Sequence, residues 1–206
     1  AGVTLTHAHW LGVDWQTDAQ ETATALCGTD WDWLIVDHYA LDRRWQMLLK
    51  PYYGQLMVID DLAAHPHGCD LLLDQNLGRM ATDYTSLVSD NCRVLVGPKY
   101  ALLRAEFNAL REYSLGRRAR PQLRHLLISM GGIDQHNATG RVLTALHSCA
   151  LAQECRITVV MGGQSPWLKS IVEQATTMPW QTRVVTDVTN MAQLMAESDL
   201  AIGAAQ

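Results

Sequence analysis

The chain has 206 residues, 48% of them hydrophobic, which is enough for one or two domains with buried cores. Its 21 Asp and Glu residues outnumber its 16 Lys and Arg residues, and the net charge of -5 argues against a general nucleic-acid-binding protein. No apolar run approaches the roughly 18 residues of a membrane-spanning helix, and no basic stretch followed by an apolar segment marks a signal peptide.

The cysteines are odd in number, and no pair of them has the C-x-x-C spacing of zinc and redox sites. This pattern indicates reduced thiols in a cytoplasmic protein rather than a disulfide framework. The five residues are Cys27, Cys69, Cys92, Cys149 and Cys155.

Short apolar runs recur along the chain, and none of them alternates apolar with polar residues. Continuous runs predict strands that are buried on both faces of a parallel sheet. The runs lie at residues 34–36, 56–59, 71–73, 94–96, 126–128, 157–160, 184–185 and 200–202.

Helical patterns lie between many of these runs. Residues 100–113 carry apolar side chains on one stripe, Ser165 followed by Pro166 predicts the start of a second helix, and Asn190 can cap a third. Strands that alternate with helices predict an α/β fold with right-handed crossover connections.

Residues 114–123 contain Gly, Pro and three Arg residues without periodicity. We interpret them as a linker between two Rossmann-like domains with parallel sheets, an N-terminal domain at 1–113 and a C-terminal domain at 124–206. The alternative is a basic patch for RNA or phosphate, which the net acidic charge disfavours. The chain starts without an initiator Met and stops just past its last apolar run, so we expect both domains to be incomplete.

Ligands of open parallel sheets bind beyond the carboxyl ends of the strands. Polar, titratable or glycine residues follow every predicted strand, and together they would line one edge of each sheet. In the first half of the chain they are Asp37, His38, Tyr39, Asp60, Asp61, Asp74, Gln75, Asn76 and Gly97. In the second half they are Gly131, Gly132, Asp134, Gly162, Gly163, Gln164, Asp187 and Gly203.

The string Ser129-Met130-Gly131-Gly132 runs from a predicted strand directly into a predicted helix. Glycines let the backbone approach a ligand, and the free amides at a helix start attract phosphate. The string is neither a P-loop nor a G-x-G-x-x-G motif. An ordinary tight turn remains the alternative interpretation, and for Gly162-Gly163 a plain helix start is sufficient.

Asp37, His38 and Tyr39 could orient a sugar or relay a proton, because all three make directional hydrogen bonds. Solvated residues at a strand end are the alternative. Asp60 and Asp61 could hold a hydroxyl or cap a turn, but adjacent side chains usually point to different sides, which argues against a shared metal.

The segment His65-Pro66-His67-Gly68-Cys69 is rich in potential metal ligands, but its spacing matches no standard zinc pattern. We therefore expect no metal there. The seven tryptophans are scattered, which is typical of packing rather than of a base-stacking platform.

Five strings occur in an order that resembles a known family: Leu-Ile-Val-Asp-His-Tyr at 34–39, Val-Ile-Asp-Asp at 58–61, Cys-Asp-Leu-Leu-Leu-Asp-Gln-Asn at 69–76, Tyr-Ala-Leu-Leu-Arg-Ala-Glu-Phe at 100–107 and Ser-Met-Gly-Gly-Ile-Asp at 129–134. The chain resembles the UDP-2,4-diacetamido-2,4,6-trideoxy-β-L-altropyranose hydrolases of pseudaminic acid biosynthesis over nearly all of its length.

The resemblance implies a GT-B-like fold, similar to the MurG-type glycosyltransferases, with two Rossmann-like domains and a cleft between them. It implies hydrolysis of the anomeric carbon–oxygen bond with inversion and release of UDP, without a metal or another cofactor. By resemblance, the C-terminal domain binds the nucleotide through Gly131, Gly132 and Asp134. The N-terminal domain faces the sugar through the residues Asp37, His38, Tyr39 and Asn76.

The resemblance also implies a histidine base in a G-x-G-H loop, and this string does not occur in the chain. His7 and His9 lack its glycine context, so the role does not transfer to them. The family's later glycine- and serine-rich loop should follow the strand at 200–202, where the chain ends. We therefore expect the chain by itself to be nearly inactive.

The sequence leaves two other functions open. A GT-B glycosyltransferase would share the fold and the nucleotide site but pass the sugar to an acceptor, and a sugar-nucleotide-binding module would bind without turnover. Fold analogy alone does not separate these functions. In each case the expected partner is a small-molecule UDP-sugar, with no nucleic acid and no membrane.

Overall fold

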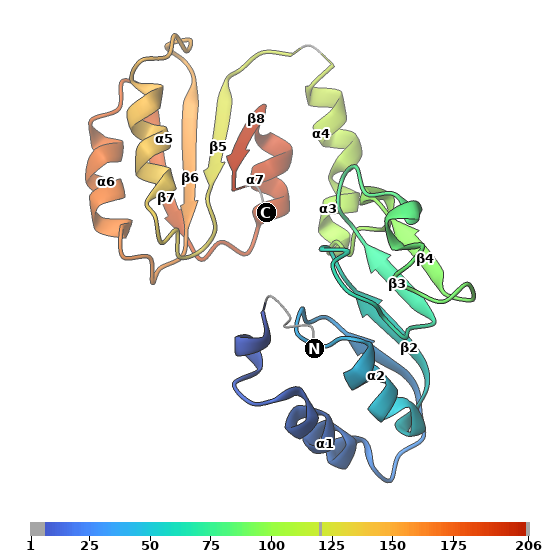
Figure 1. The fold of residues 1–206 in the computed structure, drawn as a ribbon. Coiled ribbons are helices and arrows are strands. Elements are labelled where there is room, and N and C mark those ends of the chain that lie inside the picture. The colour runs from blue at the N-terminus through green and yellow to red at the C-terminus, as the bar shows by residue number, and fades with distance from the viewer. Residues whose placement is uncertain (1–6, 120, 205–206) are drawn as a thin grey trace. The chain divides into compact units, whose positions relative to one another are not determined.

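A computed structural model of the protein describes residues 7–119 and 121–204. The chain divides into two compact units, Ala1–Leu102 and Leu103–Gln206. Each unit contains a four-stranded sheet in which all strands are parallel (Figure 1). These sheets confirm the predicted α/β class with two Rossmann-like units, and all eight apolar runs lie in strands.

The sheet of the first unit has the order β1-β2-β3-β4. Its strands are β1 (Trp31–Val36), β2 (Tyr53–Ile59), β3 (Leu71–Asp74) and β4 (Arg93–Val96). Its helices are α1 (Trp15–Leu26), α2 (Arg43–Leu49) and the 3-10 turns η1 (Ala8–Leu11), η2 (Lys50–Tyr52), η3 (Ala81–Tyr84) and η4 (Pro98–Tyr100).

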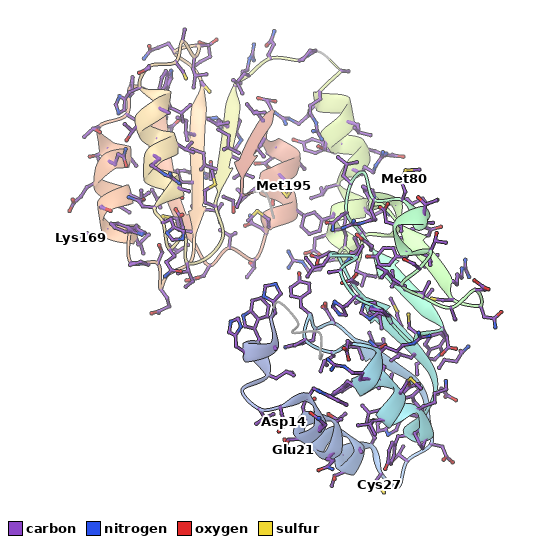
Figure 2. The ribbon with its side chains drawn as sticks, viewed as in Figure 1. Asp14, Glu21, Cys27, Met80, Lys169 and Met195 are labelled. Atoms are coloured by element: carbon purple, nitrogen blue, oxygen red, sulfur yellow. The ribbon has the colours of Figure 1, made fainter. Side chains whose placement is uncertain are left out.

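Capping carboxylates start both α-helices of the first unit. Asp14, labelled in Figure 2, accepts hydrogen bonds from the backbone N–H groups of Gln16 and Thr17 at the start of α1. Asp42 accepts one from the N–H of Arg44 at the start of α2. These bonds satisfy N–H groups that have no partner within the helix.

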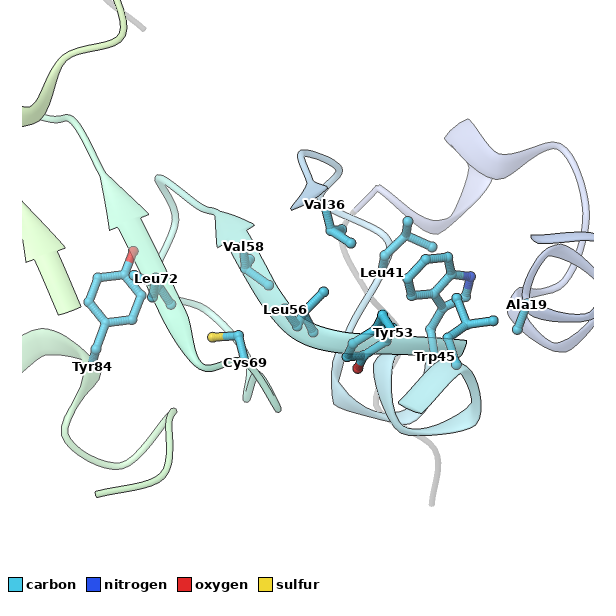
Figure 3. Packing of buried hydrophobic residues seen from close by; sticks show 11 residues of the cluster. Ala19, Val36, Leu41, Trp45, Tyr53, Leu56, Val58, Cys69, Leu72 and Tyr84 are labelled. Carbon is cyan, nitrogen blue, oxygen red and sulfur yellow. The ribbon is translucent and has the colours of Figure 1, made fainter. Parts of the chain in front are cut away.

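The first core lies between the two helices and one face of the sheet (Figure 3). Leu56 and Leu72 on the strands and Leu49 on α2 are fully buried in it. Trp45 of α2 packs there as well, and its indole N–H donates to the Asp18 carboxylate of α1 at 2.7 Å. This hydrogen bond fastens the two helices to each other.

The prediction that the strands are buried on both faces is wrong for β1. Trp31, Trp33 and Ile35 alternate along this strand and are 44%, 43% and 60% exposed. They share one face of the sheet, because every second side chain of a strand points to the same side. This face of β1 is left open by the described residues, although its side chains are apolar.

The sheet of the second unit has the order β7-β6-β5-β8. Its strands are β5 (His125–Ser129), β6 (Arg156–Met161), β7 (Gln181–Thr186) and β8 (Leu200–Gly203). Its helices are α3 (Ala105–Ala109), α4 (Arg111–Arg117), α5 (Ala138–Leu146), α6 (Leu168–Thr176) and α7 (Met191–Glu197).

Helices cover both faces of this second sheet (Figure 1). Ile128 of β5 packs on the side of α5 and α6, where Leu143 and Ile171 are fully buried. Leu127, the neighbouring residue of β5, packs with Leu194 of α7 on the opposite side. The central strands β5 and β6 are therefore buried on both faces, as predicted.

The predicted helix at 100–113 and the predicted linker at 114–123 both need correction. The structure breaks the first into η4, α3 and α4, and α4 continues to Arg117. The Arg117 guanidinium donates to the Ala196 carbonyl at 3.0 Å and to the Asp199 carboxylate at 3.1 Å. These contacts hold α4 in the second unit, so the boundary falls after Leu102 and not after residue 113. Arg120 lies outside the described residues.

None of the helices in residues 7–119 and 121–204 combines the length and the apolar character that crossing a membrane requires.

Candidate functional site

The strand order of the second unit contains a topological switch point. From β5 the chain moves to β6 and then β7 on one side, and it returns to β8 on the other side of β5. Ligands of open α/β sheets bind at the carboxyl ends of the two strands where the order reverses. Here these ends are Ser129 and Gly203, which are register partners of β5 and β8.

The predicted glycine turn follows β5 at this switch point. Gly131 has a φ of +88°, a left-handed conformation that side chains other than glycine rarely adopt. Gly131 and Gly132 are both exposed. The prediction that the turn runs directly into a helix is wrong, because residues 133–137 intervene before α5 begins at Ala138.

Asp134, predicted to lie near a nucleotide, binds the start of α5. Its two carboxylate oxygens accept hydrogen bonds from the backbone N–H groups of Ala138 and Thr139, each at 2.8 Å. Burial alone would raise the pKa of Asp134, but these hydrogen bonds outweigh it and lower the pKa. The carboxylate therefore stays ionised and fixes the end of the glycine loop.

The loop after β6 forms hydrogen bonds with the segment that contains the glycine turn. The Gly162 N–H donates to the Gly132 carbonyl at 2.9 Å, and a Cβ at Gly162 would lie only 2.5 Å from that oxygen. The Ser165 hydroxyl donates to the Ile133 carbonyl at 2.9 Å. The segment does more than start a helix, and α6 itself begins only at Leu168.

The end of β7 joins the same assembly through Asp187. Its carboxylate accepts a hydrogen bond from the Gly163 N–H at 2.9 Å, and its own N–H donates to the Met161 carbonyl at 3.2 Å. A Cβ at Gly163 would lie 2.5 Å from the Asp187 carboxylate. Hydrogen bonds thus connect the segments that follow β5, β6 and β7, and they fix the position of the exposed glycine turn.

In the first unit, Asp61 is the residue around which the predicted sugar-facing side chains gather. The Tyr39 hydroxyl donates to its carboxylate at 2.8 Å, and the Asn76 side-chain amide donates to its backbone carbonyl at 3.2 Å. The hydrogen bond to Asp61, with burial, raises the pKa of Tyr39 to about 12. Tyr39 therefore stays protonated and acts as a donor. The sequence indicates Asp61 as a strand-end residue but does not predict its central place.

His38 and Asp37 stand beside this cluster without joining it. The backbone N–H of Ala40 donates to Nδ1 of His38 at 3.1 Å, so in the neutral ring Nε2 carries the hydrogen. Asp37 is exposed. The structure thus brings Tyr39 and Asn76 together through Asp61, whereas Asp37 makes no side-chain hydrogen bond to the described residues.

Trp10 of η1 contributes an aromatic surface that sequence reasoning missed. Its ring centroid lies 5.7 Å from that of Tyr39 and 6.4 Å from that of His38, and the ring of His7 lies 5.1 Å from Tyr39. Trp10 remains 54% exposed. Nothing in the local sequence around Trp10 distinguishes it from the six other tryptophans.

A buried network of polar side chains contacts Asp61 through its backbone carbonyl. Asp60 and Asp74 are 4% and 0% exposed, and the Tyr84 hydroxyl lies 2.9 and 2.8 Å from their carboxylates. Arg79 donates to the Asp74 carboxylate at 2.5 Å and to the Asp61 carbonyl at 2.6 Å. The adjacent carboxylates Asp60 and Asp61 therefore have different partners, and Arg79 and Tyr84 complete a structure that strand-end patterns alone did not indicate.

The histidines of the 65–69 segment are buried and belong to the interior. His65 and His67 are 6% and 2% exposed, with ring centroids 4.8 Å apart. Burial lowers the pKa of His67 to about 4. Over residues 7–119 and 121–204, no group of three or more His, Cys, Asp and Glu side chains is arranged to hold a metal ion.

The chain is 31% identical over 166 residues to the UDP-2,4-diacetamido-2,4,6-trideoxy-β-L-altropyranose hydrolase of Campylobacter jejuni, and the matched region covers 81% of this chain and 57% of the hydrolase. It is 30% identical over 116 residues to the spore coat polysaccharide biosynthesis protein SpsG of Bacillus subtilis, covering 56% of this chain and 33% of that protein. An uncharacterised protein of Methanocaldococcus jannaschii is 31% identical over 109 residues, with coverages of 52% and 22%.

No protein-family model matches the chain. The similarity to the Campylobacter hydrolase confirms the resemblance indicated by the five ordered strings. This chain spans 57% of the length of that hydrolase and smaller shares of the other two relatives.

Proposed function

We propose that the second unit binds the UDP part of a UDP-sugar, with the diphosphate at Gly131 and Gly132. The observation that carries this proposal is the glycine turn at the switch point between β5 and β8, where Gly131 and Gly132 are exposed and nothing lies within 4 Å of the position that a Cβ would take, so that a ligand can approach their backbone N–H groups. Such groups bind phosphate oxygens through hydrogen bonds and local dipoles. Asp134 and Gly162 act as positioning residues, because they hold the two ends of the loop.

The first unit then binds the sugar part. Tyr39, Asp61 and Asn76 supply donors and acceptors of the kind that sugar hydroxyl and acetamido groups require. Asp37 and His38 directly precede Tyr39 in the chain and extend its polar surface. Trp10, whose ring lies beside that of Tyr39, offers an aromatic face for the apolar side of a sugar ring.

The reaction supported by the similarity to the Campylobacter hydrolase is hydrolysis of the anomeric carbon–oxygen bond. The oxygen of a water molecule bonds to the anomeric carbon with inversion, the bond to the diphosphate oxygen breaks, and its electron pair leaves with UDP. A base accepts the proton of the water. Diphosphate is a good leaving group, so the protein needs to position the water and to stabilise the charge on UDP.

This chain does not offer a base with the expected G-x-G-H context. We therefore propose that it binds the nucleotide sugar but hydrolyses it slowly by itself. The reaction as proposed uses no metal and no cofactor. Turnover of the UDP-sugar by this chain at the rate of the Campylobacter hydrolase would contradict the proposal of a missing base.

Calorimetric titration with UDP, and with ADP and CMP as controls, tests the nucleotide site. We expect selective binding of UDP. Replacement of Gly162 by Ala should weaken this binding at least about tenfold, which corresponds to about 1.4 kcal/mol, because the new Cβ would force the Gly132 carbonyl to move.

The matched control is Gly116→Ala. Gly116 lies in α4 with open space around the position of a Cβ, so this variant should bind UDP as the parent chain does. Equal affinities for UDP, ADP and CMP, or full UDP affinity in the Gly162→Ala variant, would place the nucleotide elsewhere.

A further inference from the structure

Two of the five cysteines meet in the first unit. Cys69 lies just before β3 and Cys92 just before β4, and these strands are parallel neighbours. The two sulfur atoms are 3.6 Å apart. The N–H of Arg93 donates to the Asp70 carbonyl at 2.9 Å, so the backbone beside both cysteines is already joined. The sequence predicted only unpaired thiols, because the contact depends on strand pairing.

The two thiols differ in burial and in acidity. Cys69 is 4% exposed and belongs to the core cluster of the first unit (Figure 3), whereas Cys92 is half-buried at its edge. The contact between the two thiols lowers the pKa of Cys92, while the same contact and burial raise the pKa of Cys69. The accessible member of the pair is thus the one that ionises more readily, and thiolate is the reactive form.

We propose that Cys69 and Cys92 form a redox-active pair that a disulfide oxidant such as oxidised glutathione converts into an intramolecular disulfide. The Cys92 thiolate attacks one sulfur of the oxidant, and the first glutathione leaves as a thiolate. The Cys69 thiol loses its proton and attacks the Cys92 sulfur of the mixed disulfide, which releases the second glutathione. Two cysteine thiols are oxidised, and one oxidised glutathione is reduced to two glutathione molecules.

The geometry requires a small movement only. The sulfur atoms must approach from 3.6 Å to the bond length of about 2.05 Å. Cys92 ends a turn in which its N–H donates to the Ser89 carbonyl, and both cysteines lie outside the strands that they precede. They also lie at the amino ends of the strands, away from Tyr39 and Asp61.

The other cysteines provide internal controls. Cys27, at the end of α1 (Figure 2), and Cys149 are exposed, so they are open to an oxidant. Cys155 is buried, with its sulfur 3.8 Å from the Arg156 carbonyl oxygen. None of these three has a sulfur–sulfur contact with the described residues, so an intramolecular disulfide should form between Cys69 and Cys92 alone.

The folded chain would be treated with graded mixtures of oxidised and reduced glutathione at about pH 8, alkylated, digested and analysed by mass spectrometry. We expect one linked pair of peptides that carry Cys69 and Cys92, and its loss after reduction. Alkylation of both residues in the folded chain, at glutathione ratios that modify Cys27 and Cys149, would overturn the proposal. A denatured sample shows that all five thiols can react.

Variants test the order of the two steps. Cys69→Ala should leave Cys92 as a stable mixed disulfide with glutathione, because the resolving thiol is absent. Cys92→Ser should leave Cys69 unmodified, and Cys149→Ser should form the disulfide as the parent chain does. If Cys69→Ala does not fold, the Cys92→Ser result is still decisive: glutathione on Cys69 in that variant would contradict Cys92 as the attacking thiol.

Discussion

Acidification should destabilise the first unit through His67. The side-chain amide of Gln46 donates to Nδ1 of His67 at 3.0 Å and to the Leu41 carbonyl at 3.0 Å, and its oxygen accepts from the N–H of Gly68 at 2.7 Å. These three contacts fix the orientation of the amide, so Nδ1 must act as an acceptor. Protonation at Nδ1 would place two donors against each other inside the core.

The size of the effect follows from the pKa of His67, which burial lowers from 6.5 to about 4. The unfolded chain binds a proton at this residue below about pH 6.5, and the folded chain does so only below about pH 4. The unfolded state therefore gains stability as the pH falls between these values. Linkage gives a loss of about 2 kcal/mol in the free energy of unfolding between pH 7 and pH 5, and the loss grows further until the pH falls below the folded pKa of about 4.

Urea unfolding followed by tryptophan fluorescence at pH 7, 6 and 5 measures this loss. His67→Asn is the informative variant, because asparagine offers an acceptor but does not titrate. Whatever its stability at pH 7, it should lose about 2 kcal/mol less than the parent chain on going to pH 5. Replacement of the exposed His136 by Asn is the matched control, and this variant should lose as much unfolding free energy between pH 7 and pH 5 as the parent chain does. An equal loss in the parent chain and in His67→Asn would refute the reasoning.

Three further outcomes are expected. Leu143→Ala, which removes a fully buried side chain from the second core, should destabilise the second unit by about 3 kcal/mol. Amide hydrogen exchange should become faster in residues 121–204 and stay unchanged in the first unit. Asp134→Ala should lower the free energy of unfolding of the second unit, measured with urea, by about 1 kcal/mol, because two N–H groups of α5 lose their acceptor. The depressed pKa of Asp134 means that this contribution is present above the ordinary carboxyl pKa and is lost as the pH falls through the folded value, so the two chains should converge in stability in acid. Tyr39→Phe, which removes the donor to Asp61, should weaken calorimetric binding of the UDP-sugar but leave UDP binding unchanged; an equal loss for both ligands would argue against a sugar-binding role for Tyr39.

Local patterns were sufficient to find the strands but not the environment of each strand. All eight apolar runs lie in strands, because continuous runs this short, between turn residues, have the length of a strand and not of a helix. The same pattern suggested burial on both faces, which holds for β5 and fails for β1. Trp31, Trp33 and Ile35 are as apolar as core residues, so hydropathy does not reveal that the described residues leave them exposed.

The limits of the units depended on contacts between residues that are distant in sequence. The arginines after residue 114 are typical of a solvated linker, and no local signal distinguishes Arg117 from its neighbours. Its partners, Ala196 and Asp199, lie about eighty residues further along the chain. The Asp199 carboxylate also accepts from the N–H groups of Arg124 and His125, so one side chain joins α4 to the start of β5 and β8.

For the candidate site, the sequence predicted which types of residue would gather but not the role of each one. Strand-end positions correctly indicated where carboxylates, glycines and amides would gather, because parallel strands bring their carboxyl ends to one edge. They did not separate Asp60, which turns into the core toward Tyr84, from Asp61, which meets Tyr39. Successive side chains point to opposite sides, so only the position of the strand in its sheet decides which carboxylate is accessible.

The glycines of the second unit have different structural roles in the proposed phosphate-binding loop. In the sequence, a helix start is sufficient to account for Gly162, yet a side chain there would collide with the Gly132 carbonyl. Gly131 instead needs its left-handed backbone for the turn itself. One glycine therefore shapes the turn and the other makes room for it, and a substitution at either position should alter phosphate binding through the same loop. Comparison of Gly162→Ala with Gly116→Ala distinguishes this mechanism from a general cost of adding a side chain.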